Sequence, residues 1–190
     1  MAKSFCSDRG FSIAEVAVAT GILAAVSLGV AQMFALSTAK NLAAKHQVST
    51  TTMATQKMEQ LRGLTFSYDA SGLGLPVTDT TTNLALCTPD ATGKGLNPSP
   101  SGALDANTSG FVDFLDERGN CVGTGGTTPP AGAIYTRRWA ITPLPTNPNN
   151  TLVLSVLVTT TAKEAMRGSG ARTRLVEDAL ITTVRTRKAP

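Results

Sequence analysis

The sequence predicts an α+β protein in which one long N-terminal helix precedes an antiparallel sheet. Residues 11–39 form an apolar run of 29 residues with no proline and a single charge, whereas strand patterns begin only after residue 110. Strands and helices do not alternate along the chain, as they would in a parallel sheet. We therefore expect the sheet to lie on an apolar stripe of the helix.

Composition limits the classes of function. A chain of 190 residues with a net charge of +4 has room for one domain and an anchor, and the charge is too small to require nucleic acid as a partner. The only histidine is His46. A single histidine argues against a multi-histidine metal site and against a catalytic triad. No phosphate-binding loop, nucleophile elbow or zinc motif is present. We expect no enzyme, cofactor or metal site.

The apolar run 11–39 is long enough to cross a membrane. A helix needs roughly 20 apolar residues to span a hydrocarbon core of about 30 Å, and the run exceeds the apolar part of a secretory signal, about 7–15 residues. The polar stub 1–10 before it carries Lys3 and Arg9. Basic residues before a single span keep the N-terminus in the cytoplasm.

Glu15 is the one charged side chain in this run. A carboxylate near the centre of a membrane helix costs about 2.5–3.5 kcal/mol on insertion scales. Glu15 either lies at the headgroups without a role or pairs with a cation. Cleavage between Gly10 and Phe11 would create an α-amine four residues before Glu15, available to a neighbouring subunit. We favour the pairing hypothesis.

The segment 10–16, GFSIAEV, and the apolar run after it resemble the prepilin cleavage and methylation signature of type IV pilins and of type II secretion pseudopilins. The resemblance implies that a membrane peptidase removes the leader 1–10 after Gly10 and methylates Phe11. It also implies that Glu15 pairs with the amine of an adjacent subunit. Gln32 stands where many major pilins have a proline, so a fixed kink is not expected there.

Residues 40–62 continue the helix as an amphipathic stripe. We predict one helix from Phe11 to Arg62, capped by Gly63, with His46 packed rather than ligating. The charged residues fall largely off the stripe. The apolar stripe comprises Leu42, Ala43, His46, Met53, Ala54, Met58 and Leu61, and the charged residues are Lys40, Lys45, Lys57, Glu59 and Arg62.

Residues 63–110 are predicted to be a loop region, because Gly, Pro, Ser, Thr and Asn fill 27 of 48 positions. The strand candidates lie in the region 111–190, and the best of them is central because it is apolar on both faces. They are Phe111–Leu115, Ile134–Ile141, Leu152–Thr160 and Leu175–Arg185. The helix end at 56–62 and the strand at 135–139 resemble PilV-type minor pilins.

Charge is segregated along the second half of the chain. Residues 63–130 carry a balance of −5 and residues 131–190 a balance of +6. Asp113, Asp116 and Glu117 lack the spacing of a calcium loop, so we interpret them as solvated. The basic residues could contact DNA phosphates, but solvated strand faces or contacts with neighbouring subunits are favoured. They are Arg137, Arg138, Arg172, Arg174, Arg185, Arg187 and Lys188.

Three cysteines leave one thiol over. Cys6 lies in the leader, and the family resemblance implies that a peptidase removes this leader. Cys87 and Cys121 then remain and can pair in the periplasm. Such a bridge closes a loop of about 35 residues. In the chain-entropy model it stabilises the folded state by up to roughly 3.8 kcal/mol.

The resemblance therefore implies a type IV pilin fold and a minor pilin precursor. Its implied partners are other pilins, the prepilin peptidase and methyltransferase, and an inner-membrane assembly platform. The inner membrane and then the cell surface are the expected locations. A pseudopilin and a single-span anchored periplasmic binding protein remain alternatives.

Overall fold

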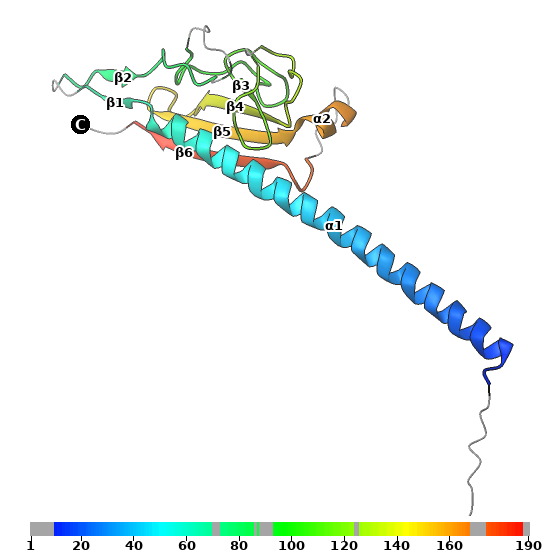
Figure 1. Cartoon of the computed structure of the whole chain (residues 1–190). Helices are drawn as coiled ribbons and strands as arrows, with labels where there is room; N and C mark the ends of the chain where they lie inside the picture. Colours follow the sequence, from blue (N-terminus) through cyan, green and yellow to red (C-terminus); the bar gives the residue numbers. More distant parts are fainter. Residues whose placement is uncertain are drawn as a thin grey trace, which may run out of the picture. The chain divides into compact units, whose positions relative to one another are not determined.

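The structure is a computed structural model that describes residues 10–69, 73–85, 87, 93–123, 126–167 and 174–187 (Figure 1). Residues 1–9 of the predicted leader, Cys6 among them, lie outside this part of the chain. The chain divides into two units, Met1–Leu42 and Ala43–Pro190, which are treated separately below.

Helix α1, Ile13–Gly63, has 51 residues and is about 77 Å long at 1.5 Å per residue. The Oγ atom of Ser12 accepts the N–H of Ala14 at 3.3 Å, so Ser12 caps the helix. Glu15 lies in the first turn, where the helix dipole favours a carboxylate. The continuous helix expected from Phe11 to Arg62 is confirmed, with ends one or two residues later.

The main sheet has four antiparallel strands in chain order, β3-β4-β5-β6. Their bounds are β3 Val112–Leu115, β4 Tyr135–Pro143, β5 Thr151–Thr160 and β6 Ala179–Thr186. β5 pairs with β4 on one side and with β6 on the other, which confirms that the most apolar strand is central. The α+β class with an antiparallel sheet is also confirmed.

The last third of α1 covers one face of this sheet (Figure 1). Met53, Ala54, Met58 and Leu61 are buried in the same cluster as the inward side chains of the strands. Those inward side chains include Trp139, Ile141, Leu152, Leu154, Val156 and Val158. The predicted stripe is therefore correct over 53–61, whereas Leu42, at its start, is 54% exposed.

The region 63–110 differs from the prediction because it contains a hairpin. β1 (Phe66–Tyr68) pairs antiparallel with β2 (Pro76–Thr78) in a separate two-stranded sheet. The side chain of Phe66 is buried in the core, and this contact stabilises strands that are too short to show a periodic pattern.

Two elements near the C-terminus also differ from the prediction. The last strand begins at Ala179 rather than Leu175, because the Asp178 carboxylate accepts the N–H of Leu175 at 2.8 Å and closes a turn. Helix α2, Thr161–Arg167, was not predicted. Its start, Thr161-Ala-Lys-Glu164, has the pattern of a capping box, which was the available signal.

Candidate functional site

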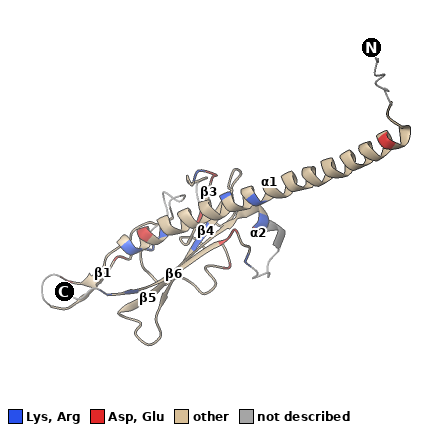
Figure 2. Cartoon of the chain, turned by 90° about the horizontal axis from the view of Figure 1, so that it is seen from below, with Lys and Arg blue, Asp and Glu red and all other residues tan. Residues whose placement is uncertain are grey.

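The first unit presents an uncovered apolar helix. Every residue from 10 to 42 is exposed, and the segment 11–39 contains one charged side chain, Glu15 (Figure 2). Monomeric soluble proteins rarely expose an apolar surface of this extent. The large apolar side chains on it are Phe11, Ile13, Val16, Val18, Ile22, Leu23, Val26, Leu28, Val30, Met33, Phe34 and Leu36.

Among the described residues, α1 alone is long and apolar enough to cross a membrane, with a mean hydropathy of 2.0 in its most apolar window. None of that window is buried. The segment is thus compatible with a membrane anchor and, by the same composition, with packing against other apolar helices.

The predicted processing and assembly residues lie together at the start of this surface. Phe11 is 82% exposed, and a shallow apolar depression contains it together with Glu15, Thr20 and Leu23. The Thr20 hydroxyl donates back to the helix carbonyls of Val16 and Ala17, so it is already satisfied. Within the described residues no Lys or Arg pairs with Glu15, so its carboxylate remains available.

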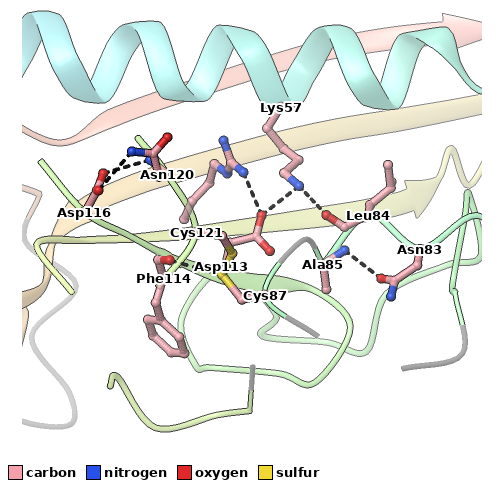
Figure 3. The surroundings of a disulfide bond; sticks show 11 residues. Lys57, Asn83, Leu84, Ala85, Cys87, Asp113, Phe114, Asp116, Asn120 and Cys121 are labelled. Atoms are coloured by element: carbon pink, nitrogen blue, oxygen red, sulfur yellow. Dashed lines mark hydrogen bonds and ion pairs between the residues drawn. A yellow bond between two sulfur atoms is a disulfide. The ribbon is translucent and has the colours of Figure 1, made fainter. Parts of the chain in front are cut away.

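The second unit contains a buried cluster of charges that the sequence analysis missed. The ammonium nitrogen of Lys57 lies 2.7 Å from Oδ2 of Asp113, and Nη2 of Arg137 lies 2.8 Å from the same oxygen. Lys57 also donates to the Leu84 carbonyl at 2.5 Å (Figure 3). Its ammonium nitrogen lies 4.2 Å from the centre of the Trp139 ring. The cluster joins α1, β3, β4 and the connection that precedes β3.

Two predictions are wrong at this cluster. Lys57 was expected off the apolar stripe and Asp113 in a solvated loop, yet both side chains are fully buried. Lys57 lies three residues after Ala54 and four before Leu61, so helical spacing directs it toward the sheet. Its burial is possible because Asp113 supplies the opposite charge.

Burial also changes the protonation of Lys57. Burial, opposed by the Asp113 carboxylate and reinforced by the Arg137 guanidinium, lowers the pKa of Lys57 to about 8. While Lys57 is charged, the cluster holds two cations and one carboxylate. In addition, Oδ1 of Asp113 and Nε of Arg137 are buried without a hydrogen-bond partner.

Among the residues that the structure describes, the basic surface considered from the sequence does not form. Arg137 and Arg138 are 1% and 4% exposed, so neither is available to DNA phosphates. The guanidinium of Arg138 donates to the Asn107 side chain at 2.9 and 2.6 Å and pairs with Glu164 of α2. Arg174 is exposed, and Arg172 and Lys188 lie outside the described residues.

Arg185 and Arg187 bind main-chain carbonyls instead of forming a patch. Arg185 donates to Leu61 O at 2.9 Å and to Leu64 O, at the end of α1, where carbonyls lack helical partners. Arg187 donates to the carbonyls of Ser67 and Val77 and lies 4.1 Å from the Phe66 ring centre. Arg185 of the last strand therefore fixes the helix end, and Arg187, directly after that strand, fixes the β1–β2 hairpin.

The disulfide between Cys87 and Cys121 is present, with the two Cα atoms 5.4 Å apart, as expected. It ties the connection between β2 and β3 to the segment after β3, in which Cys121 pairs with Leu115, the last residue of β3. His46, expected to be packed, places Nδ1 2.8 Å from the Tyr135 hydroxyl oxygen.

The described residues therefore combine two features: an uncovered apolar helix with one carboxylate near its start, and a domain fixed by buried charges and a disulfide. Comparison of the chain with protein-family models, with curated proteins and with solved structures found no match to any of them.

Proposed function

We propose that the chain is the precursor of a type IV minor pilin with the type IV pilin fold. The leader 1–10 is removed, Phe11 is methylated, and the apolar half of α1 packs against the helices of other pilins. Before assembly that half anchors the protein in the inner membrane, and the disulfide-bonded domain faces the periplasm. The proposal makes the chain a structural component rather than an enzyme.

The exposed apolar helix with its single carboxylate carries this proposal. An anchor alone needs no charge, and an unpaired carboxylate within an apolar segment is costly, so Glu15 requires a partner. Cleavage after Gly10 places a new α-amine four residues away in sequence. The amine of a neighbouring copy or of another pilin is then a partner of opposite charge at matching depth.

The first test is the N-terminus of the exported protein. We expect intact-mass and N-terminal analysis of membrane-extracted protein to find a chain that begins with N-methylated Phe11. A chain that begins at Met1 would contradict processing and favour a single-span anchored binding protein. Because a pseudopilin is processed in the same way, scoring piliation and secretion after deletion of the gene separates the two machines.

The second test concerns Glu15. Replacement by Gln keeps the size of the side chain and removes its charge, so a charge-assisted bond to a neighbouring amine is lost. We expect Glu15→Gln to lower the amount of this protein in sheared filaments, relative to its amount in the membrane, about tenfold or more. N-terminal processing should persist in this variant.

Thr20→Ala is the matched control for Glu15→Gln. Thr20 lines the same depression, but its hydroxyl is satisfied within α1 at 2.9 and 3.0 Å, so the assembled state does not require it. Filament levels of Thr20→Ala should match those of the unaltered chain. Equal filament levels for Glu15→Gln and the unaltered chain would refute the pairing role.

A further inference from the structure

We propose that Lys57 is a positioning residue for the disulfide: its ammonium group holds the main chain of Leu84 beside Asp113 and thereby brings Cys87 to Cys121. The inference concerns oxidative folding of the second unit and is independent of the proposed role in a filament.

The two cysteines reach their positions by different means. Cys121 follows β3 through a tight turn in which the Asp116 carboxylate accepts the N–H groups of Arg118 and Asn120, both at 2.8 Å. It then pairs with Leu115 as an isolated bridge. Neighbouring residues thus place Cys121 beside β3, and the contact of α1 with this turn is the exposed ion pair between Lys45 and Glu117 rather than Lys57.

Cys87 instead belongs to the connection of residues 79–111 between β2 and β3. Lys57 crosses from α1 to this connection and donates to the carbonyl of Leu84, three residues before Cys87 (Figure 3). The same ammonium group contacts Asp113 in β3, and an Asp113 carboxylate oxygen lies within 4.8 Å of both sulfur atoms. One side chain therefore links the segment before Cys87 to the strand beside Cys121.

Burial makes this link strong enough to act on the thiols. Lys57 and Asp113 are 0% exposed and Cys87 is 2% exposed, so water does not compete for these contacts. A charge-assisted hydrogen bond in such surroundings is stronger than one at the surface. In the reduced chain the link would raise the effective concentration of one thiol at the other, as a tether does.

The chemical step itself does not consume Lys57. Each thiol loses one proton and one electron as the sulfur–sulfur bond forms. The two electrons and the two protons pass to the oxidant, such as glutathione disulfide, whose sulfur–sulfur bond breaks to give two molecules of reduced glutathione. Lys57 acts only on the distance between the thiols, so its loss should appear in the equilibrium constant of this exchange.

The test measures the thiol–disulfide equilibrium of the full chain in detergent micelles, with glutathione buffers and alkylation of the free thiols. A Cys6→Ser background leaves the two relevant cysteines. We expect Lys57→Met to lower the effective concentration of the thiols at least about tenfold, which raises the reduction potential by about 30 mV. In concentrated guanidinium chloride, where the link is absent, the variant and its parent should coincide.

Arg138→Met is the matched control, because it also removes a buried cation but leaves the segment before Cys87 untouched. Its equilibrium should stay within about twofold of the parent. Lys57→Gln keeps an uncharged donor and should lie between Lys57→Met and the parent; it carries the test if Lys57→Met does not fold. An unchanged equilibrium in the folded Lys57 variant, or an equal shift in Arg138→Met, would overturn the proposal.

Discussion

At the scale of single residues, the buried cluster holds an excess of one positive charge while Lys57 is protonated. Asp113 neutralises one cation, and both Lys57 and Arg137 contact the same oxygen of it. The pKa of Lys57 is about 8 in the folded chain and 10.5 ordinarily. The folded chain therefore binds this proton less tightly than the unfolded chain does. This difference makes stability depend on pH.

The direction of that dependence follows from the two pKa values. Between pH 8 and 10.5 the unfolded chain binds more protons, so the free energy of unfolding rises with pH across this window. Over this window, the free energy of unfolding of the unaltered chain should rise by up to about 3 kcal/mol more than that of Lys57→Met. Unfolding followed by the fluorescence of Trp139, the only tryptophan, measures it. Stability profiles of the two proteins that run parallel through this window would refute the lowered pKa.

At the scale of elements, the sequence predicted those whose pattern is long and regular. The helix and the central strand were placed correctly because α1 has no proline and β5 carries apolar side chains on both faces between Leu152 and Val158. The hairpin β1–β2 escaped prediction because each strand has three residues and depends on Arg187, more than 100 positions away. Such contacts between distant residues have no local signal.

The same distinction applies to side chains. Cys87 and Cys121 were predicted to pair because they are the two cysteines left in an oxidising compartment. Glu15 was predicted to be a subunit contact because it is the one charged side chain in an apolar run. Lys57 and Arg137 were assigned to solvent because charged residues are seldom fully buried. Only the tertiary fold brings Asp113 to within 2.8 Å of both cations, which reverses that expectation.

At the scale of the whole molecule, the two units have separate requirements. All described residues of the hydrophobic core lie at or after Met53, and none of them belongs to the described segment 10–42. That earlier segment exposes its apolar side chains and needs lipid or other helices to cover them. The second unit should therefore fold without the first.

A chain that begins at Ala43 tests this independence. We expect it to be soluble and monomeric without detergent, because it keeps the complete core, the buried charges and both disulfide cysteines. Size-exclusion chromatography with light scattering measures the mass, and the emission of buried Trp139 reports the fold. A second truncated chain, beginning at Met58, removes Met53, Ala54 and Lys57 and should unfold. Aggregation of the chain from Ala43, with exposed Trp139, would show instead that folding of the domain requires the apolar half of α1.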